Sequence, residues 1–306
     1  MRPAFQHQTR KIDCNKCENL TMTDLAFVTT CKGRLHHIQQ TLPLMIAESP
    51  AEIVVVDYGC PQGVGEWVAS NHPEVTVVRV DDDPGFCLPR ARNLGAQNTS
   101  ANWLCFIDAD VKLTPGWTQW MAENLDPRCF YRAGMVNGER IKDTWGTVLC
   151  TRKAFADVGG YDEAFGGWGG EDDDLYERLK MFGYKEAAYP AQFVDAIHHD
   201  DMARTLFHEI KDKELQFFVN RFYSEAKRDL LKIIGRELPL ADRQVMMKKI
   251  KAEIMAWGLE RANPTAGFTT TFSIPAWLPE PFRMLKTYTI TLNMQKMERT
   301  QVPPTK

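Results

Sequence analysis

Short apolar runs alternate with segments of helical periodicity over the first 200 residues. Runs rich in Val, Ile, Leu and Phe predict four strands, at residues 25–30, 53–57, 75–80 and 103–107. Between them, apolar residues recur with helical spacing at residues 35–46, 64–70 and 89–98. This alternation predicts an α/β fold, a mostly parallel sheet with flanking helices, because parallel strands need crossovers and are buried on both faces. We expect ligand-binding groups directly after the strand ends.

Residues 201–306 have a different pattern. Two long amphipathic stretches, 202–234 and 240–257, predict helices that carry Lys and Arg between apolar positions, and Gly235 and Pro239 separate them. Beyond them, prolines alternate with aromatic residues, so we expect no long regular element there. These prolines are Pro264, Pro275, Pro279, Pro281, Pro303 and Pro304. We therefore expect an N-terminal tail (1–20), an α/β domain (21–200) and a helical C-terminal extension with its own tail (201–306).

Composition and charge narrow the class of protein. Of the 306 residues, 44% are hydrophobic and 25% charged, which is typical of a globular protein rather than a fibrous or disordered one. The formal net charge of -3 excludes a global cationic field, so we expect no nucleic-acid partner. The charge is uneven, since residues 201–306 contain 18 Lys and Arg against 12 Asp and Glu, whereas residues 1–200 contain 19 against 28.

The basic extension has two interpretations. Basic amphipathic helices can lie on an anionic membrane surface, but such helices more often pack on the rest of the protein or on a second subunit, and we favour packing. No run of 18 apolar residues and no secretory signal is present, so we expect a cytoplasmic protein, or one peripheral to a membrane. The lone pair Cys14 and Cys17 favours ordinary thiols over a metal or redox site.

Two carboxylates, Asp108 and Asp110, follow the strand predicted at residues 103–107. Residues two apart in an extended chain point to the same side, so both face the expected ligand crevice. Carboxylate oxygens suit Mg2+ or Mn2+ held against the phosphates of a substrate. Solvated loop carboxylates share this spacing, and the motif alone supports both interpretations equally.

A more specific motif occupies residues 166–174, with the sequence GGWGGEDDD. Its glycines permit a tight loop that approaches a ligand closely, and Trp168 offers a flat apolar surface. Four consecutive acids then open a helix, whose N-terminus favours negative charge. A simple helix cap needs one carboxylate and no tryptophan between glycine pairs. We therefore interpret the motif as part of a functional site.

This motif resembles the acceptor-site motif of the β-1,4-galactosyltransferase family. The Trp145-Gly146-Thr147 segment resembles the glycine-containing donor-site segment of that family. Residues 28–34, 55–60 and 89–95 are similar to the nucleotide-binding loops and uridine-side helix of family 2 glycosyltransferases. The resemblance covers residues 21–200 in order and implies a GT-A fold, a Rossmann-like sheet that carries a nucleotide-sugar transferase. Residues 201–306 have no counterpart in it.

The resemblance implies roles for the acidic residues. Asp110 would bind Mn2+ or Mg2+, and Asp108 would support the metal or the ribose of the donor. A further metal ligand would come from the Ile197-His198-His199-Asp200 segment, with His199 the better match and His198 the second choice; a surface histidine pair is the alternative. Asp172 would be the general base that removes the proton of the acceptor hydroxyl in a single, inverting displacement.

The other site residues would bind the two substrates. The acceptor-binding set, which would contact a carbohydrate, is Trp168, Gly170, Glu171 and Asp173. The donor-binding set, which would contact a UDP-sugar, is Thr30, Lys32, Arg34, Asp57, Arg90, Arg92, Asp108 and Gly146. The sequence departs from the resemblance at Tyr58, where a second acid is common, and at Thr30 and Cys31, where Pro and an aromatic residue are usual.

Three functions compete. We expect an inverting, metal-dependent transfer of a hexose or N-acetylhexosamine from a UDP-sugar to a glycan or other hydroxyl acceptor, as in polysaccharide biosynthesis. A transferase-like protein that binds carbohydrate or nucleotide without turnover is the alternative, and the set of Asp108, Asp110, Asp172 and His199 argues against it. A different metal-dependent nucleotidyl enzyme would leave Trp168 and its flanking glycines unexplained.

Overall fold

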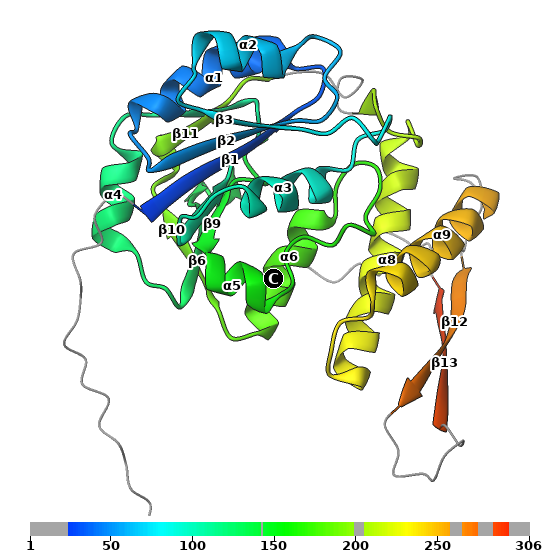
Figure 1. The fold of residues 1–306 in the computed structure, drawn as a ribbon. Coiled ribbons are helices and arrows are strands. Elements are labelled where there is room, and N and C mark those ends of the chain that lie inside the picture. Colours follow the sequence, from blue (N-terminus) through cyan, green and yellow to red (C-terminus); the bar gives the residue numbers. More distant parts are fainter. Residues whose placement is uncertain (1–23, 142, 199–204, 258–264, 275–283, 294–306) are drawn as a thin grey trace, which may run out of the picture.

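A seven-stranded sheet forms the centre of the computed structural model, which describes residues 24–141, 143–198, 205–257, 265–274 and 284–293 (Figure 1). The strand order is β10-β6-β9-β4-β1-β2-β3. The strands are β1 (Leu25–Cys31), β2 (Glu52–Asp57), β3 (Thr76–Arg79), β4 (Trp103–Phe106), β6 (Cys129–Ala133), β9 (Val148–Thr151) and β10 (Lys185–Tyr189). Only β9 runs antiparallel to its neighbours, so the prediction of a mostly parallel sheet is confirmed.

Helices cover both faces of this sheet (Figure 1). On one face lie α1 (Leu35–Ala47), α2 (Val64–Asn71) and α4 (Trp117–Asn124), around a core that includes Phe27 and Val55. On the other lie α3 (Leu88–Gln97), α5 (Arg152–Asp157) and α6 (Glu171–Met181), around Val28 and Phe106. Neighbouring residues of β1 thus point to opposite faces and are buried on both, as the apolar runs predicted.

Two small sheets flank the central one. β5 (Val111–Leu113) pairs antiparallel with β11 (Val194–Ala196), which follows the short helix η2 (Ala191–Phe193). The Ile197 amide then donates a hydrogen bond to the Asp110 carbonyl at 2.7 Å. This pairing brings the chain that leads to His198 next to the end of β4. β7 (Met135–Val136) and β8 (Glu139–Arg140) form a short hairpin at the molecular surface.

The two helices predicted in the C-terminal extension are confirmed as α8 (Lys213–Ile234) and α9 (Leu240–Trp257). Asp212 caps α8 by accepting hydrogen bonds from two amides, and Gly235 ends it with a φ angle of 75°. The buried stripe of α8, which includes Val219, Tyr223 and Leu230, packs with Phe165 of the α/β domain and with α9. Packing on the rest of the protein, the favoured interpretation, is therefore confirmed for α8.

No helix in the described part of the chain is long and apolar enough to cross a membrane. Membrane contact or self-association through residues 201–306, and a cytoplasmic location, stay predictions. Cys14 and Cys17 lie outside the described residues.

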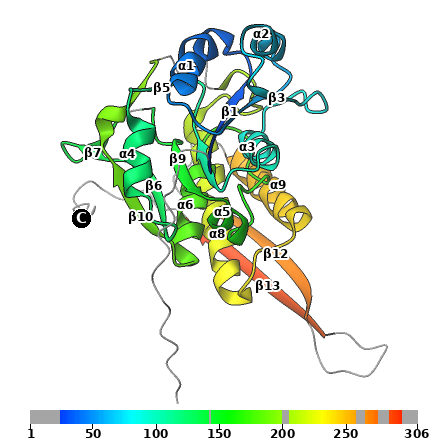
Figure 2. The same ribbon diagram turned by 60° about the vertical axis from the view of Figure 1, so that its left-hand side comes forward.

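The prediction that no long regular element follows residue 263 is wrong. β12 (Thr265–Ile274) and β13 (Met284–Asn293) pair antiparallel over their whole length and project beyond α9 (Figure 2). The prolines that indicated irregular structure fall outside both strands, whereas Thr side chains, favoured in strands, recur within them. Thr269 and Thr289 hydrogen-bond across the ladder at 3.0 Å. The prolines delimit the strands and do not exclude them.

Candidate active site

The Asp-x-Asp motif leaves the end of β4 next to the loop that follows β1. The Ile107 amide donates to the Val28 carbonyl at 3.0 Å, which extends the pairing of the two strands to the start of the motif. Asp110 is 4% exposed, and Arg34 Nη1 donates to its Oδ2 at 3.1 Å. The carboxyl ends of adjacent parallel strands thus bring Arg34 and Asp110 together, as expected at this edge of the sheet.

The glycine-rich motif forms a loop that turns into α6. Gly167, Gly169 and Gly170 have φ angles of 89°, 82° and 93°, in the left-handed region that other residues enter only with strain. α6 begins at Glu171, so four carboxylates occupy its first turn, at the positive end of the helix dipole. Glu171 is buried and Asp172 is half-buried, whereas Asp173 is exposed. The helix start predicted from the motif is confirmed.

One buried guanidinium joins the two motifs. Arg92 of α3 is 2% exposed; its Nη2 donates to Asp108 Oδ1 at 2.6 Å and its Nη1 donates to Asp172 Oδ1 at 2.5 Å. The Arg92 guanidinium also lies 4.9 Å from the centroid of the Tyr161 ring. The sequence placed Arg92 among the donor contacts, but the structure gives both arms of this side chain to carboxylates. In this structure the guanidinium holds Asp108 and Asp172 side by side.

Gly146 lets the backbone pass close to these three side chains. A Cβ atom at this position would lie 2.6 Å from Arg92 Nη2, 2.7 Å from Asp108 Oδ2 and 3.1 Å from Asp172 Oδ2. Carbon atoms do not approach polar atoms so closely without displacing them. The chemistry of the site therefore explains why residue 146 lacks a side chain.

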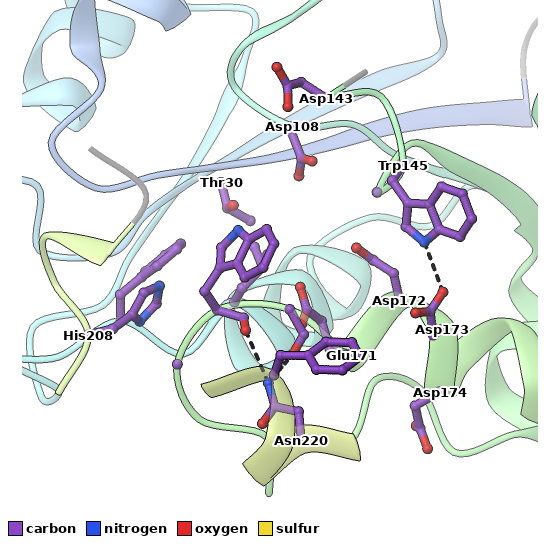
Figure 3. A pocket seen from close by; sticks show the side chains of 18 of the residues that line it. Thr30, Asp108, Asp143, Trp145, Glu171, Asp172, Asp173, Asp174, His208 and Asn220 are labelled. Atoms are coloured by element: carbon purple, nitrogen blue, oxygen red, sulfur yellow. Dashed lines mark hydrogen bonds between the residues drawn. The ribbon is translucent and has the colours of Figure 1, made fainter. Parts of the chain in front are cut away.

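The residue before Gly146 is fixed to α6 by polar and ring contacts. Trp145 Nε1 donates to Asp173 Oδ1 at 2.9 Å (Figure 3). The Tyr176 hydroxyl donates to the Trp145 carbonyl at 2.7 Å. The Arg132 guanidinium lies between the two rings, 4.2 Å from the Trp145 centroid and 3.8 Å from that of Tyr176. Asp173 was expected to contact the acceptor, and in this structure one of its oxygens is already used to hold Trp145.

Burial raises the pKa values of two carboxyl groups in the first turn of α6. The pKa of Glu171 rises to about 8, because burial and the adjacent charge of Asp172 both disfavour ionisation. Burial also raises the pKa of Asp172, and the Arg92 charge opposes that rise. At neutral pH a Glu171 carboxyl with this pKa is mostly protonated and can donate a hydrogen bond. Asp172, held by a cation, is the member of the pair that stays ionised more readily.

A cavity of about 430 Å³ collects most of the predicted site residues. The side chains of Asp108, Glu171 and Asp172 converge on it (Figure 3). Of the predicted residues, those that line it are Thr30, Lys32, Arg34, Asp108, Asp110, Gly146, Trp168, Gly170, Glu171, Asp172 and Asp173. Its size is within the range of small-molecule sites. The cavity thus brings residues of the Asp108–Asp110 motif and of the glycine-rich motif together.

Like Arg92, two more of the predicted donor contacts do not line the cavity. Asp57 is fully buried, accepts hydrogen bonds from the amides of Cys60 and Gly65 at 2.7 and 3.0 Å, and pairs with Arg79 at 2.5 Å. Arg90 pairs with Asp82 at 2.7 Å. Neither residue lines the cavity, because the protein itself uses their polar groups. The assignment of Asp57 and Arg90 to the donor stays a prediction.

Lys32 lines the cavity but also holds a loop. Its Nζ donates to the carbonyls of Gly85 and Pro84 at 2.6 and 3.1 Å. These bonds tie the loop after β1 to the segment that precedes α3. The side chain thus has a structural use besides any contact with a substrate.

Helix α8 forms a wall of the cavity, which the sequence did not reveal. Asn220 Nδ2 donates to the carbonyls of Trp168, at 3.1 Å, and of Gly169 (Figure 3). Gln216 Nε2 donates to the Gly166 carbonyl at 2.9 Å and to Asn220 Oδ1 at 2.9 Å. Both amides are buried, at 2% and 3% exposure. Two amides four residues apart, beside the apolar stripe of a helix, are the sequence signal that could have identified this clamp.

Residues 205–210, which precede α8, contribute a histidine to the cavity. His208 is buried and lines it. Its pKa falls to about 4, because burial and then the charges of Lys211 and Arg34 disfavour protonation. The imidazole is therefore neutral at physiological pH and can accept or donate a hydrogen bond.

The carboxylate pair provides the donor atoms that a divalent metal prefers. Asp108 and Asp110 line one cavity, and their hard oxygen atoms fit Mn2+ or Mg2+. His198, the second-choice ligand, lies 3.3 Å from Asp143 Oδ2, is 70% exposed at its side chain and does not line the cavity. His199 lies outside the described residues, although Ile197 is hydrogen-bonded to Asp110. Within the described ranges, no three acidic, His or Cys side chains are grouped as a metal site.

Sequence comparison identifies a related segment in galactosyltransferases. Residues 140–203 match a family model described as the N-terminal domain of galactosyltransferase. β-1,4-Galactosyltransferase 2 of Cricetulus griseus is 31% identical over 134 residues, which are 40% of this chain and 32% of that protein. β-1,4-Galactosyltransferase 5 of Danio rerio is 54% identical over 35 residues, 11% of this chain and 9% of the relative. The chain thus spans about a third, or less, of these relatives.

Solved structures match a larger part of this chain than the sequence relatives do. S. aureus TarS (residues 1–349) in complex with UDP-GlcNAc superposes with a TM-score of 0.54 at 13% identity, over 76% of this chain and 71% of that one. Mannosyltransferase PcManGT from Pyrobaculum calidifontis, in complex with GDP-Man and Mn2+, gives a TM-score of 0.50 at 15% identity, over 76% and 74%. The fold is the GT-A fold. Together with the galactosyltransferase segment, it supports a GT-A glycosyltransferase.

Proposed function

We propose that the protein is an inverting, metal-dependent glycosyltransferase that moves a hexose or N-acetylhexosamine from a UDP-sugar to a hydroxyl acceptor. One observation carries the proposal: the two arms of buried Arg92 hold Asp108, from the donor-side motif, and Asp172, from the acceptor-side motif, at the wall of one cavity. A transfer reaction needs the donor phosphates and the acceptor hydroxyl to meet, and this guanidinium joins the groups assigned to each.

The reaction would be a single displacement. The acceptor oxygen attacks the anomeric carbon, a new glycosidic bond forms as the bond to the diphosphate breaks, and UDP leaves with the bonding electrons. The acceptor proton passes to Asp172. A base is most effective when its pKa lies near the working pH, and burial moves the pKa of Asp172 in that direction. Attack from the side opposite the leaving group inverts the anomeric centre.

A divalent cation, when bound, would neutralise the charge that develops on the leaving diphosphate. Asp110 and Asp108 are the residues that would hold it, with His199 as the proposed further ligand. Arg34 is placed beside Asp110, at 3.1 Å, where its guanidinium can also contact phosphate oxygens.

The loop and the first turn of α6 would bind the acceptor. The Lys213 ammonium lies 4.0 Å from the centroid of the Trp168 ring, so an acceptor sugar would stack on the opposite face of the indole. Protonated Glu171 would donate a hydrogen bond to an acceptor oxygen. Asp173 would bind a sugar hydroxyl through the oxygen that Trp145 does not use.

Release of UDP from a panel of UDP-sugars, with and without Mn2+, tests the proposal. We expect turnover of one or two donors that requires the metal. The D172N variant should lose about 10²–10⁴-fold in turnover, because it removes the proton acceptor. Its affinity for UDP with Mn2+ should stay near that of the native protein, because the variant leaves the proposed metal ligands in place. D110A should weaken both. D229N, an exposed change on α8, is the matched control.

The outcomes separate the candidate functions. Binding of UDP without turnover of any donor, across varied acceptors, would favour the alternative of a carbohydrate- or nucleotide-binding protein. Turnover that D172N retains would assign the base to another acid of the cluster. Turnover that is unaffected by removal of divalent metal would contradict metal dependence and leave the rest of the proposal standing.

A further inference from the structure

Helix α8 presents one continuous edge to the cavity. The residues of α8 that line it are Phe217, Asn220, Arg221, Ser224 and Arg228. Their spacing of three and four residues places them on one face of the helix. The Gln216 and Asn220 bonds to the glycine-rich loop fix this face against the acceptor side of the site. These hydrogen bonds therefore fix this edge of α8 as part of the cavity wall.

This edge of α8 carries more positive than negative charge. Arg221 and Arg228 share one acid among the described residues, Glu225. Arg221 Nη2 lies 2.7 Å from its Oε1, whereas Arg228 Nη1 is 3.3 and 3.4 Å from the two oxygens. A single carboxylate cannot neutralise two guanidinium groups. Arg228, 27% exposed at its side chain, keeps most of its donors for another anion.

Acidic residues of other elements line the same cavity. They are Asp108, Asp110 and the carboxyl groups that open α6. From Asn220, beside the glycine-rich loop, to Arg228 the helix rises by about 12 Å. A ligand that is neutral at one end and anionic at the other would therefore be oriented in this cavity, with its anion on the arginine edge and its hydroxyl towards Asp172.

We propose that the acceptor is an anionic saccharide, whose carboxylate or phosphate binds Arg228 and Arg221 at a distance from the reacting hydroxyl. Guanidinium groups bind both anions through paired hydrogen bonds. This inference rests on the proposed function, because it names the acceptor class of that site. It distinguishes an anionic glycan from the neutral sugars that the acidic loop alone would accept.

Paired glycosides that differ only in charge test the proposal. Binding of 4-nitrophenyl β-D-glucuronide and 4-nitrophenyl β-D-glucoside, and of the matching galacturonide and galactoside, is measured by calorimetry on the full chain with UDP and Mn2+. We expect the charged member of at least one pair to bind about tenfold more tightly at low salt, a difference of about 1.4 kcal/mol. The preference should shrink in high salt, since an exposed guanidinium is screened.

Two variants of α8 test whether Arg228 causes the preference for the charged glycoside. R228Q should abolish the preference for the charged glycoside and leave the affinity for UDP unchanged. K232Q is the matched control, because it removes one positive charge from α8 at an exposed residue that does not line the cavity. K232Q should keep the preference.

Three results would overturn the proposal. They are equal or absent binding of both members of every pair, an equal loss of preference in K232Q, and a fall of UDP affinity in R228Q, which would assign the arginine to the donor diphosphate. Metal-dependent turnover of a UDP-sugar with a neutral acceptor would leave the proposed function standing in each case. Absence of all turnover would instead count against that function.

Discussion

Replacing Glu171 by glutamine is expected to change how stability depends on pH. Glu171 is 5% exposed, and its pKa is about 8 in the folded protein against an ordinary value of 4.5. Below pH 4.5 the carboxyl is protonated in both states. Between these two values the unfolded chain releases the proton and the folded protein keeps it, so the free energy of unfolding falls as pH rises. Above the folded pKa the loss is complete.

The size of the effect follows from the two pKa values. Each pH unit inside the window costs about 1.4 kcal/mol, so this one group removes about 3 kcal/mol of unfolding free energy between pH 5 and pH 8. Asp172 is the neighbour whose charge contributes to the shift, and the slope belongs to the two groups together. The E171Q side chain keeps the shape and cannot ionise, so it should lack this slope.

Urea unfolding followed by tryptophan fluorescence, at constant ionic strength and at four pH values from 5 to 8, measures the effect. The stability difference between E171Q and the native protein should grow by about 3 kcal/mol over this range in favour of the variant. E177Q, a change of the same kind on the exposed side of α6, is the matched control. A constant difference between E171Q and the native protein would refute the account of the Glu171 pKa.

Three further changes test the site and a buried ion pair of α8. G146A places a Cβ atom within 2.7 Å of Arg92 and Asp108, and should lower kcat/KM about 100-fold or more while costing about 1–3 kcal/mol of stability; near-normal kinetics would show that the backbone yields. N220A removes the clamp on the Trp168 carbonyl, and should raise the acceptor KM about tenfold with UDP affinity unchanged; an equal loss for both substrates would indicate general disorder. K227M should destabilise the fold by about 3–5 kcal/mol in urea unfolding, because this buried lysine pairs with Asp162 and Asp174 at 2.8 and 2.6 Å; a change below about 1 kcal/mol would contradict that role.

The sequence predicts the α/β core well because its signals are local. Four strands and three helices of the first 107 residues are where periodicity places them, since buried parallel strands have few polar positions to confuse the pattern. The hairpin of β12 and β13 was missed for the opposite reason. Its prolines dominate the local composition, while the strands between them depend on pairing with each other and contact with α9.

The candidate site also has parts that the sequence predicts and parts that it does not. The motifs around Asp108 and Asp172 are contiguous in sequence, and each was identified from its own residues. The partners of Arg92 could not be predicted, because an arginine on a helix has many possible ligands and only the packing of α3 selects two carboxylates. Asn220 and Gln216 lie about 50 residues beyond the loop they hold, a contact that no local pattern encodes.

Arg92 makes the two carboxylates energetically dependent on each other. In the D108N variant, Asp172 is the remaining charged partner of the guanidinium, so the two pair more strongly. The effects of D108N and D172N on stability should therefore be non-additive in a double-mutant cycle, with a coupling of about 1–3 kcal/mol. The same dependence has a kinetic form. A donor that draws Asp108 away from the guanidinium alters the basicity of Asp172 before any acceptor is present.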